Sequence, residues 1–187
     1  MTILEIKKEV ELTKQEISQI KYVDDDPDRY NELYNKLNKL MTIYSIVSKP
    51  MIAYSDELDI YEEKKGLNTY VYHLMLHNDV KQVGYIRITY DDGLSMYGNI
   101  GYEIKLPYRG NDFTLKALEM LESTMIEKGL TNPIITARKN NIASNRVIEK
   151  FGGELIDNKS DGLTYNSYQV DLLKKKHQEF KQKIKHL

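Results

Sequence analysis

The segment NIGYEIKLPYRGNDFT occupies residues 99–114, and its pattern is typical of a strand, a loop and the start of a helix. Apolar and polar or small residues alternate over 99–106, which predicts a strand. One face of this strand would carry Ile100, Tyr102, Ile104 and Leu106. An amphipathic helical pattern follows from Asp112 to about Lys128, with Gly129 placed to end it.

The loop between these two elements, residues 108–114, has the features of an anion-binding site. The first turn of a helix leaves backbone amides without partners, and the helix dipole adds positive charge there. Gly110 allows close approach of a ligand, Asp112 tolerates a left-handed backbone, and Thr114 can add a hydroxyl donor. The same pattern is also common in simple turns. The candidate ligand-binding residues are Arg109, Gly110, Asn111, Asp112, Phe113 and Thr114.

Outward from this segment, the sequence predicts an α+β fold with a central mixed, mostly antiparallel sheet flanked by helices. An antiparallel hairpin is expected from the runs 70–76 and 83–90. Further strands are expected at 133–137, 154–156 and 165–170, with a second amphipathic helix at 142–151. Strand, helix, strand, helix and strand in succession imply a right-handed crossover onto a mixed sheet.

Residues 1–67 are expected to be mainly helical. Asp26-Pro27 is a helix start signal, and a second, short helix is predicted over 56–65. Residues 3–10 suit either a strand or the lead into a helix that Thr13 would cap. The long helix would bury one face made of Leu33, Leu37, Leu40 and Tyr44, widened by Tyr34 and Met41.

A C-terminal helix is expected over 172–187, with one apolar face of Leu173, His177, Phe180, Ile184 and Leu187. Docking of this face against its own domain is the preferred interpretation, and a homodimer contact is the alternative.

Composition limits the function. The 187 residues fit one domain, and 27 Lys and Arg balance 28 Asp and Glu, so no global charge recruits nucleic acid or an anionic membrane. The chain has no cysteine and no long apolar run, which suits a cytoplasmic location. The run Lys174-Lys175-Lys176 is best explained as a solvated helix end. No metal site is expected, because His73 and His77 lack carboxylates at a suitable spacing.

A second informative segment, NNIASNRVIEKFGG at residues 140–153, follows about thirty residues after the loop. Together with RGNDFT at 109–114 and the preceding GNIGYEIKLPY, it resembles the two signature segments of the GNAT superfamily of N-acetyltransferases, in particular an uncharacterised subgroup of predicted acetyltransferases. The resemblance covers roughly Tyr70 to Val170. It implies a core at 68–171 that binds acetyl-coenzyme A (acetyl-CoA), within a single domain spanning 1–187.

The resemblance also implies roles for individual residues. The family loop pattern places Arg109 at its first position, with the pyrophosphate of acetyl-CoA on the loop. It departs from that pattern at Asp112, where glycine is usual, and at Thr114, where glycine or alanine is usual. Asp112 could instead cap the helix. The backbone N–H of Ile104 would bind the thioester carbonyl.

In the second segment, Asn141 resembles the asparagine that contacts the cosubstrate, and Ser144 falls on the same side of the helix. Both also suit a purely structural role, as helix cap and first-turn residue. Ile148 stands where many family members carry a tyrosine that protonates the leaving thiolate. That role would then fall to Ser144, a nearby tyrosine or water.

The activity implied is transfer of an acetyl group from acetyl-CoA to a primary amine by direct attack in a ternary complex. Glu103 is the candidate general base and Ser144 a candidate acid. The alternative is an acyl-CoA-binding or protein-interaction module that has lost turnover. The acceptor, a small molecule or a peptide amine, cannot be identified from the sequence.

Overall fold

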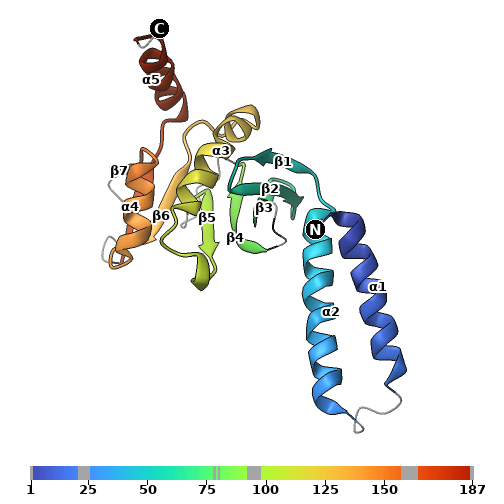
Figure 1. Ribbon diagram of the computed structural model, residues 1–187. Helices are drawn as coiled ribbons and strands as arrows, with labels where there is room; N and C mark the ends of the chain where they lie inside the picture. The colour runs from blue at the N-terminus through green and yellow to red at the C-terminus, as the bar shows by residue number, and fades with distance from the viewer. Residues whose placement is uncertain are drawn as a thin grey trace.

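Helices α1 (Ile3–Gln19) and α2 (Pro27–Val47) form an antiparallel pair that extends away from the sheet (Figure 1). The computed structural model describes residues 2–20, 26–77, 79, 81–91, 98–156 and 164–185, with side chains up to 182. Residues 3–10 are helical because Thr2 and Glu5 form a reciprocal capping box at the start of α1. Thr13 is therefore not a cap. It is buried inside the helix, where its hydroxyl donates to the Glu9 carbonyl at 2.8 Å.

Helix α2 begins at the predicted signal, with the Asp26 side chain accepting from the Arg29 N–H at 3.0 Å. Leu33 is buried as predicted. Tyr34 and Met41, expected to widen the buried face, are instead 49% and 50% exposed. At the other end of the pair, a second hydrophobic cluster joins the two helices to the sheet through Ile6, Ile43, Ile46, Val47 and Met75.

The described residues form one eight-stranded sheet with strand order β1-β2-β3-β4-β5-β6-β8-β7. All neighbouring strands are antiparallel except β5 and β6, which are parallel, so the predicted mixed sheet is confirmed. The strands are β1 (Met51–Tyr54), β2 (Leu58–Lys64), β3 (Thr69–Leu76), β4 (Gln82–Thr89), β5 (Ile100–Ile104), β6 (Ile134–Arg138), β7 (Glu154–Ile156) and β8 (Tyr165–Gln169). The predicted turn of the β3–β4 hairpin at 77–79 lies partly outside the described residues.

The helix predicted over 56–65 is wrong, because this segment is strand β2. Leu58 and Ile60 alternate with polar residues and are fully buried on one side of the sheet. The strand pairs with β3 along its whole length, from Leu58 opposite Leu76 to Lys64 opposite Tyr70. Together with β1, it makes the first 67 residues less helical than expected.

Helices α3 (Phe113–Glu127) and α4 (Ile142–Lys150) follow the predicted pattern. The main core lies between them and the sheet. The four side chains of α3 predicted to face inward, Ala117, Leu118, Leu121 and Met125, are fully buried. The two helices lie beside β5 and β6 (Figure 1).

Helix α5 (Leu172–Lys185) forms as predicted but docks only through its first turns. Leu172 is buried, and the Lys175 ammonium pairs with Glu122 and lies 4.5 Å from the centre of the Phe151 ring. Leu173 and Phe180 are 52% and 63% exposed, so the expected apolar face is not covered by its own domain where it is described. The helix points away from the sheet (Figure 1). None of the described helices is long and apolar enough to cross a membrane.

Candidate functional site

Strand β5 separates from β6 shortly after the two strands meet. Their ladder has a single pair, Ile100 opposite Ile135. In contrast, β5 pairs with β4 from Ile100 to Ile104 without interruption. The C-terminal half of β5 therefore has a strand neighbour on one side only, within the described part of the sheet.

The hydrogen-bonding alternation shows which amides face the open side. Thr89 N–H donates to the Asn99 carbonyl at 2.9 Å, and Lys105 N–H donates to the Val83 carbonyl at 2.8 Å. In an antiparallel pair, only alternate residues bond to a given neighbour. Odd-numbered residues of β5 thus bond to β4, and the backbone groups of Tyr102 and Ile104 point toward the gap beside β6. The family resemblance led us to expect, at Ile104, an amide that would bind the thioester carbonyl.

The loop after β5 folds back on the strand end. Residues 106–108 form a short 3-10 helix in which Leu106 is 77% exposed, so it does not share the buried face predicted for it. Pro107 ends the strand pairing at this point because it has no N–H to donate. Arg109 Nε donates to the Ile104 carbonyl at 2.9 Å, and Asn111 Nδ2 donates to the Tyr108 carbonyl at 3.2 Å.

Two positive φ angles shape the loop. Gly110 has φ +83°, and a Cβ added there would meet nothing within 4 Å. Asp112 has φ +53°, which fits the left-handed tolerance expected of it. The surface at Gly110 is therefore open backbone, which a ligand can approach closely.

Helix α3 starts with amides free to bind an anion. Its first internal hydrogen bond runs from Lys116 N–H to the Asp112 carbonyl, so the amides of residues 113–115 have no partner within the helix. Phe113 opens the helix, and Thr114 is buried, with 7% exposure. These amides and the loop backbone form a cradle for an anionic group.

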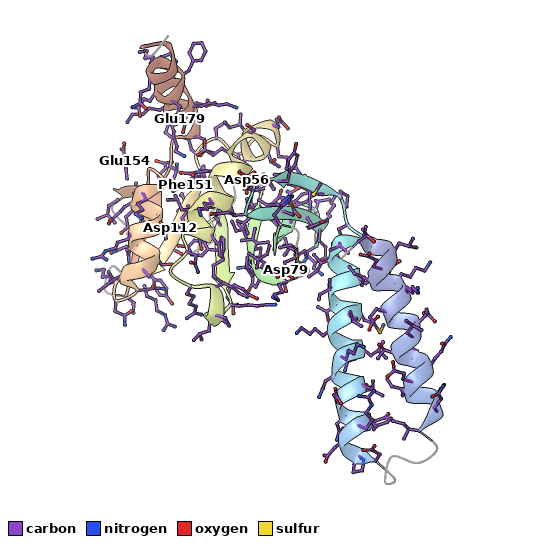
Figure 2. The ribbon with its side chains drawn as sticks, in the orientation of Figure 1. Asp56, Asp79, Asp112, Phe151, Glu154 and Glu179 are labelled. Carbon is purple, nitrogen blue, oxygen red and sulfur yellow. The ribbon has the colours of Figure 1, made fainter. Side chains whose placement is uncertain are left out.

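Asp112 does not cap α3, contrary to the capping hypothesis. Its side chain accepts no capping hydrogen bond, because a left-handed backbone differs from the extended geometry of a usual cap. Its carboxylate instead lies 3.5 Å from Lys150 Nζ at the end of α4. Figure 2 shows Asp112 beside α4. Lys150 therefore offsets the negative charge that Asp112 brings to the cradle.

The start of α4 joins the site through Ser144. Asn141 Oδ1 accepts from the Ser144 N–H at 3.2 Å, so Asn141 is the helix cap. The Ser144 hydroxyl lies 2.8 Å from the hydroxyl of Tyr102, whose side chain reaches across from β5. Sequence analysis missed this role for Tyr102, because the alternation in β5 assigned it only to the core.

Burial raises the pKa of Tyr102 above its usual value, and the hydrogen bond with Ser144 opposes part of that rise. Tyr102 therefore keeps its proton at neutral pH. Ile148, at the position where a tyrosine acid is usual, is fully buried in the core. Among the described residues, Tyr102 and Ser144 are thus the hydroxyl pair that α4 and β5 bring together.

Glu103 points to the opposite face of the sheet from Tyr102 because successive side chains of a strand alternate. It is exposed, and its carboxylate accepts from the Tyr85 hydroxyl at 3.1 Å. Burial, followed by this hydrogen bond, raises the pKa of Tyr85. Glu103 is therefore separated from Ser144 by the sheet itself, while its own backbone adjoins Ile104.

The two histidines predicted to be structural have carboxylate partners that their spacing could not reveal. His73 Nε2 lies 2.8 Å from Glu63 and His77 Nδ1 lies 2.8 Å from Asp59, both on β2. Burial raises the pKa of Glu63, but hydrogen bonds from Lys65 and His73 outweigh it and lower that pKa to about 2. No group of three or more metal-ligating side chains occurs among the described residues.

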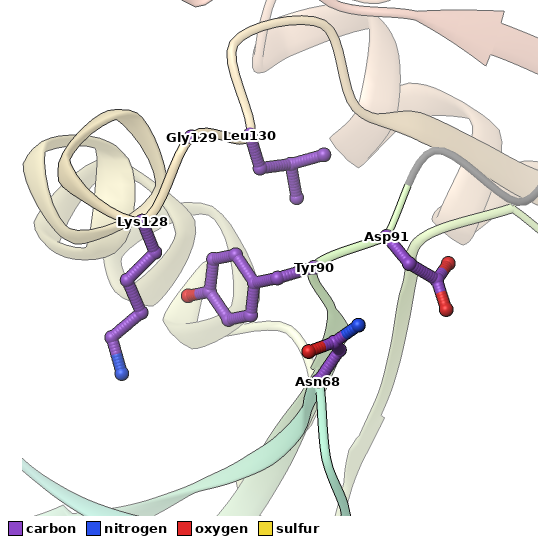
Figure 3. A pocket seen from close by; sticks show the side chains of 6 residues that line it. All are labelled: Asn68, Tyr90, Asp91, Lys128, Gly129 and Leu130. Carbon is purple, nitrogen blue, oxygen red and sulfur yellow. The ribbon is translucent and has the colours of Figure 1, made fainter.

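A cavity of about 380 Å³ lies elsewhere, between the end of α3 and the end of β4 (Figure 3). It is lined by Asn68, Tyr90, Asp91, Lys128, Gly129 and Leu130. A helix rises 1.5 Å per residue, so the length of α3 puts this cavity roughly 20 Å from Asp112. It lies far from the cradle, so it is not part of the site.

An open strand end beside an anion cradle suits a ligand that carries a phosphate group. The family comparison agrees: the acetyltransferase (GNAT) domain matches residues 20–154, well over half of the chain. The chain belongs to the GNAT acetyltransferase family. No curated protein matches the sequence.

Solved structures that match the chain share little sequence with it. A domain from Methanocaldococcus jannaschii is 15% identical, with 57% of this chain and 69% of that one aligned and a TM-score of 0.48. An acetyl transferase from Salmonella typhimurium that modifies the N-terminal serine of a 50S ribosomal subunit protein is 19% identical, over 56% and 64%, with a TM-score of 0.45. A GNAT-family acetyltransferase from Bacillus anthracis is 20% identical, over 55% and 66%, with a TM-score of 0.44. The chain spans less than two thirds of the latter two.

Proposed function

We propose that the protein transfers an acetyl group from acetyl-CoA to a primary amine by direct attack in a ternary complex. The observation that carries this proposal is the position of the Ile104 amide. It faces the gap beside β6 and immediately precedes a loop whose backbone is open at Gly110. Family membership supports acetyl transfer as the reaction class.

The loop residues Arg109 to Thr114 would hold the pyrophosphate of acetyl-CoA through backbone amides. Anions bind at such helix starts because free N–H groups and the helix dipole converge there. Arg109 already bonds the Ile104 carbonyl with one nitrogen. Its remaining guanidinium N–H groups can reach a phosphate, since the residue is exposed. Asn141, as the cap of α4, holds Ser144 in place, and it would also contact acetyl-CoA.

The chemical step needs a polarised carbonyl, a neutral amine and a proton for the thiolate. The Ile104 N–H would donate to the thioester oxygen, where negative charge develops. Glu103 would take a proton from the attacking amine, directly or through one water. As the new C–N bond forms, the C–S bond breaks. The Ser144 hydroxyl would donate the proton that the sulfur receives.

A second candidate is a binding module without turnover. The fully buried Ile148 favours it, because the usual acid position offers no proton donor. The two candidates differ in one observable: both bind acetyl-CoA, but only the enzyme releases the free thiol in the presence of an amine.

The test is thiol release from acetyl-CoA with a panel of small amines and peptides. Glu103→Gln should lower kcat/KM by about 100-fold, the scale of a lost general base, and leave acetyl-CoA affinity unchanged. Glu119→Gln, on the exposed side of α3, is the matched control and should behave like the wild type. Binding without turnover in the wild type would favour the module. Wild-type turnover with an unaffected Glu103→Gln variant would exclude Glu103 as the base.

A further inference from the structure

The contact between Tyr102 and Ser144 links β5 to α4 across 42 residues of sequence. The two hydroxyl oxygens are 2.8 Å apart, and the Tyr102 hydroxyl also lies 3.3 Å from the Ser144 carbonyl. Tyr102 stands two residues before Ile104, so their side chains lie on the same face of β5. The pair therefore lies on the α3 and α4 side of the sheet, next to the gap beside β6.

Ser144 alone is a poor proton donor for the reaction. A serine hydroxyl is a much weaker acid than a thiol, so it cannot give a proton to a thiolate unless another group replaces that proton in the same step. Transfer becomes favourable when the group behind it has a pKa closer to that of the thiol, because general acids work best near that match. A tyrosine is closer than a serine to the thiol.

A second tyrosine that contacts α4, Tyr168, forms hydrogen bonds with other residues of that helix. The Tyr168 hydroxyl donates to Asn145 Oδ1 at 2.8 Å and lies 3.3 Å from Glu149. Asn145 in turn accepts from Asn166 and donates to the carbonyls of Arg138, at the end of β6, and of Asn141, the cap of α4. This network is a buried structural link between β8 and α4, one residue along the helix from Ser144.

We propose that Tyr102 supplies the proton for the leaving thiolate through the Ser144 hydroxyl, in place of the tyrosine absent at position 148. This inference rests on the proposed function. As the C–S bond breaks, its electron pair stays on sulfur, which takes the Ser144 proton, while Ser144 takes the proton of Tyr102. The tyrosinate then recovers a proton from water, and the proton removed from the amine leaves through Glu103.

The environment of Tyr102 fits this role. Burial raises its pKa, so the hydroxyl remains protonated between turnovers. Its hydrogen bond with Ser144 acts in the opposite sense, by stabilising the charged form. Tyr102 is therefore protonated at neutral pH, and its hydrogen bond with Ser144 stabilises the tyrosinate that forms when Tyr102 gives up its proton.

The experiment compares Tyr102→Phe with the matched control Tyr168→Phe, which removes a tyrosine hydroxyl that also contacts α4. Tyr102→Phe should lower kcat with acetyl-CoA by about 100-fold at nearly unchanged KM, the scale of a lost general acid. Tyr168→Phe should keep kcat within about 3-fold, because it lacks a place in the reaction. Both variants are first checked for an unchanged acetyl-CoA affinity.

A second donor separates proton supply from packing. With 4-nitrophenyl acetate, whose leaving group departs without a proton at neutral pH, kcat/KM of Tyr102→Phe should stay within about 2-fold of the wild type. The double variant Tyr102→Phe with Ser144→Ala should be no slower than the slower single variant, because both belong to one relay.

The outcomes are distinguishable. If Tyr102→Phe lost as much activity with 4-nitrophenyl acetate as with acetyl-CoA, or if the rate losses of the two single variants added up in the double variant, the relay would be overturned. Tyr102 would then be assigned to packing. Unchanged kcat in Tyr102→Phe, with an active wild type, would overturn the relay alone. A wild type that releases no thiol with any acceptor, water included, would overturn the proposed function together with the relay.

Discussion

Asp112 stands where the family usually has glycine, and the structure accommodates both its backbone and its charge. Its backbone is left-handed, a conformation that costs an ordinary residue roughly 1 kcal/mol more than glycine. Its carboxylate, next to an anion cradle, is offset by Lys150 at 3.5 Å. Because both side chains are more than half exposed, the pair itself adds little stability. Its significance is electrostatic, since it reduces the repulsion that a bound pyrophosphate would meet.

Asp112→Gly should therefore tighten acetyl-CoA binding by up to about 5-fold, the equivalent of about 1 kcal/mol between exposed like charges. Lys150→Gln should do the opposite and weaken binding, because the carboxylate loses its partner. Calorimetric titration of both variants checks these signs. If Asp112→Gly weakens binding, the carboxylate holds the loop in shape rather than repelling the ligand.

At the residue scale, sequence reasoning located the loop whose open backbone forms the cradle, and it missed the contact between the Tyr102 and Ser144 hydroxyls. The loop from Arg109 to Thr114 could be predicted because glycine and a helix start have local signatures. The contact of Tyr102 with Ser144 could not, because it depends on how α4 packs against β5. The alternation in the strand correctly placed Tyr102 inside but gave no information on its hydroxyl.

At the scale of elements, helices α3 and α4 were predicted to within two residues, because strong periodicity and terminal glycines mark them. Strand β2 was misread as a helix. Its run of charged residues suits a short exposed helix, and only pairing with β3 makes it a strand. Helix α5 was predicted, but its docking was not: packing against α3 ends after the first turns, a tertiary outcome that an amphipathic pattern cannot reveal.

Pairing of β2 with β3 brings His73 into contact with Glu63 and predicts a pH dependence of stability. Burial, the main cause, lowers the pKa of His73 below its usual 6.5, although the contact with Glu63 acts against it. The His73 imidazole therefore binds a proton more readily in the unfolded chain than in the folded one. The free energy of unfolding should fall as the pH drops below about 6.5. Glu63 affects stability at lower pH. Its ionised carboxylate stabilises the fold fully above pH 4.5, and this stabilisation is lost as the pH falls toward the folded-state pKa of about 2.

His73→Gln should flatten the decline in the free energy of unfolding between pH 7.5 and 5, as measured by urea titration. His177→Gln, an exposed histidine on α5, is the matched control. A wild-type protein that gains stability on acidification over this range would show that His73 is charged in the fold, paired as a cation with Glu63.

At the scale of the whole molecule, the candidate site lies where one sheet, two helices and one loop meet. The helix pair α1 and α2, and helix α5, project from this core. The family match covers 20–154, so all of α1 and all of α5 lie outside it. The fold class, the mixed sheet and the location of the loop all followed from the sequence. The direction of the projecting helices did not, since few contacts with the core determine it.

The central claim is that acetyl-CoA binds on the open backbone at Gly110, and its most direct test is calorimetric titration of three proteins. Gly110 and Gly129 begin and end the same helix region with φ of +83° and +87°, and a Cβ at either meets nothing within 4 Å. Gly110→Val and Gly129→Val should thus lose similar stability, on the order of 1–3 kcal/mol. We predict saturable binding to the wild type and to Gly129→Val, and none to Gly110→Val. Equal affinity of Gly110→Val and the wild type, or no binding to the wild type, would contradict the account.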